Sequence, residues 1–116
     1  MIKALIARDV GCSRYTVDIE GHAEFAEEGK DIVCAGVSAL AMAAVKTLST
    51  LEEAGMCRVT ACDTPHPGSL HLETEVDEGA QKVSIMTVIS MLAHGLEGIA
   101  QQYPDNIQLA IDAPQG

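Results

Sequence analysis

The sequence predicts an α+β domain in which a largely antiparallel sheet packs against two main helices. Three observations indicate this class. Several short segments alternate apolar and polar residues, two long segments repeat apolar residues at helical spacing, and the predicted strands come mostly in pairs joined by short turns. The expected order is ββαββαβ. A chain of 116 residues, 47% of them hydrophobic, can build one core, so we assign a single domain to residues 1–116.

The first two strands form a predicted hairpin. Residues 2–8 are the opening strand, and 9–11 are a turn. In residues 13–20 the apolar side chains Tyr15, Val17 and Ile19 alternate with polar ones, as in a half-buried strand. A loop follows over 21–31, because this segment holds two glycines and a cluster of acidic residues.

Asp31 is the predicted N-cap of the first helix, which runs to about Glu53 and ends before Gly55. The first half of this helix is apolar nearly all round. A helix of that kind is usually buried on more than one side. We therefore expect it to lie between the sheet and either a second layer or a second copy of the chain.

The second half of the chain again places a helix after a hairpin. Residues 56–62 and 69–76 form the hairpin, and two prolines stiffen the connection over 63–68. A helix begins at about residue 80, Pro104 stops it, and residues 106–112 form the last strand. The apolar residues that recur at helical spacing are Ile85, Val88, Ile89, Leu92, Leu96, Ile99 and Tyr103.

The charge of the chain argues against a nucleic-acid partner. The net charge is −10 and only seven residues are basic, whereas phosphate binding needs clustered Lys and Arg. The acidity either attracts a basic partner or serves only solubility. The chain has no uninterrupted apolar run of 18 residues and no signal-peptide pattern, so we expect no membrane association. The expected location is the cytoplasm, with the four cysteines as free thiols.

Cys34 is the first candidate for chemistry. With Asp31 as N-cap it is the third residue of the helix, where free N–H groups and the helix dipole favour a thiolate. The same N–H groups would serve as an oxyanion hole. The alternative is an inert buried thiol, since free cysteine is among the most buried residue types.

His22 is the second candidate. It follows a predicted strand, and the loop between it and Cys34 is long enough to fold back. A Cys–His pair joined in space is how cysteine hydrolases activate their nucleophile. The alternative is a histidine at a strand end that bonds only to backbone.

The residues around His22 and Cys34 form a motif that continues near the end of the chain. Its segments are Gly21-His22-Ala23, Asp31-Ile32-Val33-Cys34-Ala35 with Ser38, and Gly95-Leu96, Ile99-Ala100 and Tyr103-Pro104. With these segments the sequence resembles, over essentially the whole chain, the ribosomal-processing cysteine proteases of Gram-positive and related bacteria. The resemblance implies that His22 and Cys34 form a catalytic dyad. It also implies removal of a short N-terminal extension from a large-subunit ribosomal protein, and a homodimer with a mobile loop between the two residues.

Three further residues belong to the same motif. Asp31 caps the helix, orients His22, or does both. Ser38 lies four residues after Cys34 on the same helix face, where it bonds near the thiolate or back to the backbone. Gly21 precedes the histidine. We expect the loop to contact substrate through its acidic rim. The alternative is an acidic loop that is only solvated. The loop residues concerned are Glu24, Phe25, Glu27 and Glu28.

A metal site is not expected, and neither is a cofactor. Cys57, Cys62, His66 and His71 resemble a zinc pattern only loosely, because three residues separate the middle pair where a finger has a long span. Cys57 and Cys62 also differ in strand parity, which predicts that they point to opposite faces of the sheet.

Two other functions fit parts of the pattern. A non-catalytic ribosome-associated factor would use the acidic loop to bind a basic protein tail without cutting it. A redox-sensing thiol protein would oxidise Cys34 reversibly. Cleavage of a ribosomal precursor separates the protease from both.

Overall fold

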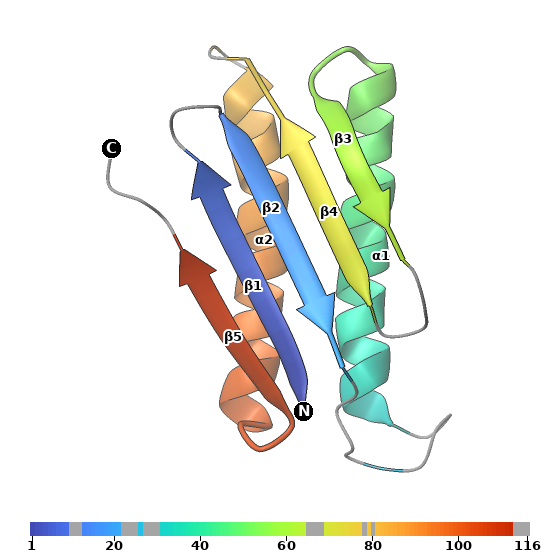
Figure 1. Ribbon diagram of the computed structural model, residues 1–116, viewed down its shortest axis with the longest axis vertical. Coiled ribbons are helices and arrows are strands. Elements are labelled where there is room, and N and C mark those ends of the chain that lie inside the picture. Colours follow the sequence, from blue (N-terminus) through green and yellow to red (C-terminus); the bar gives the residue numbers. More distant parts are fainter. Residues whose placement is uncertain are drawn as a thin grey trace.

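The protein is a five-stranded sheet with two long helices packed on one face (Figure 1). The computed structural model describes residues 1–9, 13–21, 26, 31–64, 69–77, 79 and 81–112. The observed order is ββαββαβ, which confirms the predicted fold class. The elements are β1 (Ile2–Asp9), β2 (Arg14–Glu20), α1 (Ile32–Glu53), β3 (Arg58–Asp63), β4 (Leu70–Glu75), α2 (Gln81–Gln102) and β5 (Ile107–Asp112).

The sheet has the strand order β3-β4-β2-β1-β5. Both predicted hairpins are present, because β1 pairs with β2 and β3 pairs with β4, each antiparallel. The two hairpins join through the antiparallel β2–β4 ladder. The last strand then pairs with β1 in parallel, so the sheet is mixed. Its two edge strands are β3 and β5.

Alternation along each strand divides the sheet into two faces. Tyr15, Val17 and Ile19 of β2 point to the helices and are at most 5% exposed, as the sequence predicted. The same face receives Val33 and Leu48 of α1. The aliphatic core therefore lies between one face of the sheet and the helical layer. Further core residues are Ile2, Ala4, Ile6, Leu72, Ile85, Ile89, Leu92, Leu96 and Ile107.

The predicted helix ends are confirmed by their local geometry. Asp31 is the N-cap of α1, and Gly55 follows the C-cap Ala54 with a positive φ of 78°. The second helix ends at Gln102, two residues before Pro104. Close helix contact depends on Gly95, because a Cβ there would lie 2.8 Å from both Cδ atoms of Leu40. The two helices can therefore approach closely at this point.

The outward side of the helical layer is apolar and exposed, so within one chain α1 is buried on one side only. Met42 is 53% exposed, and Val83, Met86 and Met91 of α2 are 66%, 37% and 72% exposed. We call these four residues the outer helix face. By length and composition alone, both helices could also cross a membrane, although neither has an uninterrupted apolar run. Core helices pass the same test, and here each packs on the sheet.

The open face of the sheet carries a network of charged side chains. Arg14 donates to Glu75 at 2.5 Å and bridges β2 to β4. His71 bonds to Asp18 through Nδ1, and its Nε2 lies 3.6 Å from Glu73. The alternation in β2 is visible in the sequence, but these partners are not, because they are set by the register of β2 against β4.

A bulge in β3 changes the predicted direction of one cysteine. The register shifts between Val59 and Ala61, after which Cys62 lies opposite the buried Leu72. Partners across a ladder share a face, so Cys62 is on the helix side, and Cys57 is buried on that side as well. The prediction of opposite faces was wrong, because it assumed uninterrupted alternation.

Candidate active site

Cys34 lies in the first turn of α1, at the end of the sheet where β2 stops (Figure 1). Its side chain is partly buried and packs against the core, but it is not sealed from solvent. A partly exposed thiol can react with molecules in solution. It therefore differs from Cys57, which is buried and bonds to the Leu48 carbonyl at a sulfur–oxygen distance of 3.7 Å.

Asp31 holds the turn that carries the nucleophile. Its Oδ1 accepts from the backbone N–H groups of both Val33 and Cys34 at 3.0 Å. Its carbonyl accepts the Ala35 N–H at 3.0 Å, and its Oδ2 lies 3.5 Å from the Ala26 nitrogen in the preceding loop. The predicted capping role is thus confirmed, and the same carboxylate also ties the loop to the helix.

This cap changes the expected chemistry of the turn. The N–H groups of Val33 and Cys34 are occupied, so they do not form a ready oxyanion hole as the sequence suggested. The carboxylate also places a negative charge at the positive end of the helix. Both effects oppose a thiolate held by the helix alone, and a basic partner for Cys34 is correspondingly more important.

Gly21 is the described residue that leads from β2 toward His22. Its φ of 104° lies in the region that favours glycine. A Cβ at this position would also collide with the carbonyl oxygen of Met1. The motif needs a glycine here because the chain turns sharply against the backbone at the start of β1.

Several predicted site residues lie outside the described part of the chain. These are His22, Glu24, Phe25, Glu27 and Glu28, so the proposed dyad remains a prediction. Ser38 is described, lies one turn after Cys34, and is exposed. No metal-binding group of three or more His, Cys, Asp or Glu residues occurs among the described residues. His66 of the loose zinc pattern also lies outside them.

A sheet with two helices on one face, and a partly exposed cysteine at a capped helix start, is an arrangement that an enzyme with a thiol nucleophile can use. The family model described as cysteine protease Prp matches residues 1–108. The chain belongs to this family.

Individual relatives agree with this assignment. The chain is 31% identical over 112 residues to the ribosomal processing cysteine protease Prp of Bacillus subtilis (strain 168), covering 94% of this chain and 96% of that protein. It is also similar to the Prp protease of S. aureus in complex with a covalently linked product peptide. That structure has a TM-score of 0.78 at 26% identity, over 97% of this chain and 100% of the other. The structure of a Streptococcus mutans protein has a TM-score of 0.68 at 27% identity, over 98% of this chain and 96% of the other.

Proposed function

We propose that this cysteine protease removes a short N-terminal extension from a large-subunit ribosomal protein in the cytoplasm. Cys34 is the nucleophile, and His22 is the general base and acid. The observation that carries the proposal is the position of Cys34, half-buried in the first turn of α1 at the end of the strand that leads to His22. The covalent product complex of the S. aureus relative supports peptide cleavage as the reaction.

The proposed mechanism follows from the two groups. His22 takes the thiol proton of Cys34, and the thiolate attacks the scissile carbonyl to form a tetrahedral intermediate. His22 then protonates the leaving amine, which leaves an acyl-enzyme. A water molecule, deprotonated by His22, releases the acid product and restores the thiol.

Asp31 gives this mechanism a conformational requirement. Its Oδ1 occupies the N–H groups of Val33 and Cys34, so these groups can bind the oxyanion only when the carboxylate moves away. Because Oδ2 reaches Ala26, a substrate that displaces Ala26 would trigger that movement. Substrate binding and completion of the site are then coupled.

The charge of the protein fits a basic substrate. The net charge is −10, and the loop expected to contact substrate carries Glu24, Glu27 and Glu28. Ribosomal proteins are basic as a class, so an acidic rim raises their local concentration at the site. We expect the cleavage rate at low substrate concentration to fall with added salt.

The decisive experiment is the intact mass of an extended ribosomal precursor before and after exposure to the protein. We expect loss of the extension with the native chain, and a fall of several orders of magnitude with Cys34→Ala or His22→Ala. Cys62→Ala is the matched control, because Cys62 is an exposed thiol away from this turn. Full cleavage by Cys34→Ala would exclude the proposed nucleophile.

The same experiment tests the non-catalytic alternative. A factor that only binds a basic tail would leave the precursor mass unchanged with the native chain. It would retain the same affinity for the precursor in Cys34→Ser. The partly exposed position of Cys34 favours the protease.

We also propose that the protein is a homodimer formed through the outer helix face. Between Ile32 and Leu51 the only charged residue is Lys46, whereas the open face of the sheet carries charged side chains of both signs, among them Arg14, Asp18 and Glu75. Two copies of charge −10 therefore approach most favourably through the outer helix face, whose four residues are all uncharged. A shallow groove of about 480 Å³ on α2, lined partly by Val83, Met86 and Met91, offers a complementary surface.

Molar mass in solution tests the dimer. We expect light scattering after size-exclusion chromatography to give twice the chain mass for the native protein and for Gln108→Lys, which adds a charge on the open sheet face. Met91→Lys should shift the protein to monomer, because it buries a charge in the interface. A monomeric native chain, or a dimeric Met91→Lys variant, would contradict the proposal.

A further inference from the structure

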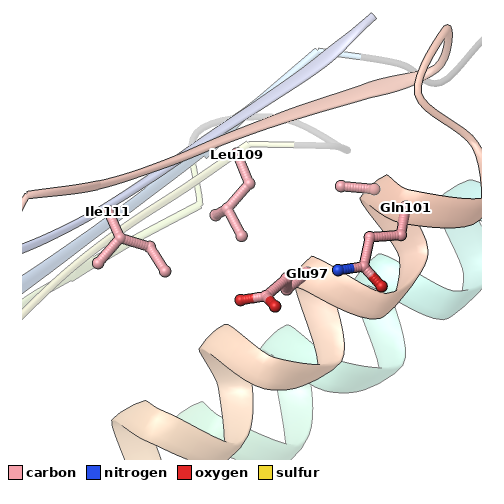
Figure 2. A pocket seen from close by; sticks show the side chains of 5 residues that line it. Glu97, Gln101, Leu109 and Ile111 are labelled. Atoms are coloured by element: carbon pink, nitrogen blue, oxygen red, sulfur yellow. The ribbon is translucent and has the colours of Figure 1, made fainter.

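A groove at the β5 edge of the molecule is separate from the turn that carries Cys34. It lies between α2 and β5 and has a volume of about 330 Å³. Figure 2 shows Leu109 and Ile111 of the strand pointing toward the helix that carries Glu97 and Gln101. Ile111 is 51% exposed, so apolar surface is left uncovered at this edge.

The backbone groups of β5 that point away from β1 include those of the same two residues. Ile2 lies opposite Ile107, and its N–H donates to the Asn106 carbonyl at 2.9 Å. In a parallel ladder the residues that bond to the neighbour alternate with residues whose N–H and C=O point away from it. Leu109 and Ile111 therefore direct their backbone groups outward and their side chains into the groove. A strand placed beside them would meet both.

The two edges of the sheet differ in how well they are protected. At the β3 edge, Arg58 and Asp63 are charged and a bulge interrupts the register between Val59 and Ala61. These features discourage pairing with another chain. The β5 edge keeps regular register with β1 over six residues, and its only charged residue is Asp112. It is the edge suited to accept a strand.

The polar lining of the groove indicates the charge of the occupant. Glu97 is exposed on α2, and no ion pair among the described residues involves it. Together with Asp112 it makes this edge acidic. A second copy of the chain would bring equal acidic groups against it, which opposes self-pairing.

We propose that β5 is a docking edge for an extended basic peptide segment of a partner protein. The segment adds a strand beside Leu109 and Ile111 and places an apolar side chain in the groove. A lysine or arginine two positions away, on the same face of the added strand, reaches Glu97. This site acts through backbone pairing and charge and does not use Cys34.

A binding titration that needs no cleavage tests the docking edge. The probe is a fluorescein-labelled hexapeptide, Thr-Val-Thr-Lys-Thr-Val, followed by fluorescence anisotropy, with backbone amide shifts recorded by NMR. We expect saturable binding with the largest shifts in 107–112. Glu97→Gln should weaken the affinity by about two- to fivefold, the range of a partly exposed ion pair. Glu53→Gln, an exposed carboxylate at the end of α1, is the matched control and should not change it.

Two altered probes separate the contribution of charge from that of backbone pairing. Replacing the probe lysine by glutamate should weaken binding to the native chain, and N-methylation of alternate probe residues should abolish it, because it blocks strand addition. The proposal is overturned if the probe does not bind, if Glu97→Gln binds as well as Glu53→Gln, or if the shifts centre on β3 or on the start of α1. Because no product is measured, failure here leaves the protease assay unaffected.

Discussion

The carboxylate of Asp31 affects Cys34 in two opposing ways. By accepting the N–H groups of Val33 and Cys34 it stabilises the turn that positions the thiol. By bringing a negative charge to the helix start it disfavours an anion on that thiol. An asparagine would keep the hydrogen bonds and remove the charge, so the two effects can be separated.

Asp31→Asn should leave the unfolding free energy nearly unchanged, whereas Asp31→Ala should lower it by about 1 kcal/mol through loss of the cap. Both variants should react faster than the native chain with iodoacetamide at Cys34 near neutral pH, because the negative charge at the start of α1 is removed. Urea unfolding and alkylation rates measure the two effects. Asp112→Asn, at the exposed end of β5, is the control and should change neither.

Gly21→Ala is expected to destabilise the protein more than Gly55→Ala. Both glycines have positive φ, so both substitutions strain the backbone by about 1 kcal/mol. Only at Gly21 would the added Cβ also meet the Met1 carbonyl, whereas nothing lies within 4 Å of a Cβ at Gly55. The comparison of urea midpoints isolates the collision, and equal losses would contradict it.

The contact between α1 and α2 gives a matched pair of glycines within one helix. Gly95→Ala should lower the unfolding free energy by about 1–3 kcal/mol, because its Cβ would lie 2.8 Å from Leu40 in the packed interface. Gly98→Ala should raise it by up to about 1 kcal/mol, because the site is open and alanine favours the helix. Thermal or urea unfolding checks the sign, and a loss in both variants would contradict the packing argument.

For single elements, the local sequence was sufficient to predict where each helix ends. It carried no signal for contacts between distant segments. Asp31, Gly55 and Pro104 marked the helix ends because caps and breakers act within one turn. The strand order was not predictable, because the parallel pairing of Ile2 with Ile107 depends on contacts across the whole chain. The bulge near Thr60 carries no turn residue that would reveal it, and it reversed the predicted direction of Cys62.

The candidate site was likewise predictable only in part. The place of Cys34 in the first turn followed from the cap residue three positions earlier. The occupied N–H groups are a direct consequence of that cap, so the same donors cannot also form a ready oxyanion hole as predicted. The distance between His22 and Cys34 depends on the path of a long loop, which no local pattern specifies.

Over the whole molecule, the open face of the sheet makes stability depend on pH in two directions. The hydrogen bond that His71 donates to the Asp18 carboxylate raises the pKa of His71 above its usual 6.5, so protonated His71 stabilises the fold below that pH. This contribution is lost as the pH rises through the raised pKa. The hydrogen bond from Arg14 lowers the pKa of Glu75 below 4.5, so its contribution is present above that pH and is lost as the pH falls through the lowered pKa.

The histidine contribution can be measured between about pH 6 and about pH 8. We expect the native urea midpoint to fall over this interval, and His71→Gln to reduce the fall. Glu53→Gln, an exposed carboxylate at the end of α1, is the control and should retain it. An unchanged slope in His71→Gln would show that the His71–Asp18 contact does not contribute.

The parallel pairing of β1 with β5 also sets the order in which a growing chain can complete its sheet. The first strand made must wait for the last one, while both hairpins and both helices can already form. Until residues 107–112 leave the ribosome, β1 presents an unpaired edge, which is a site for wrong association. A contact that closes so long a loop is slow, so docking of β5 is the expected late step of folding.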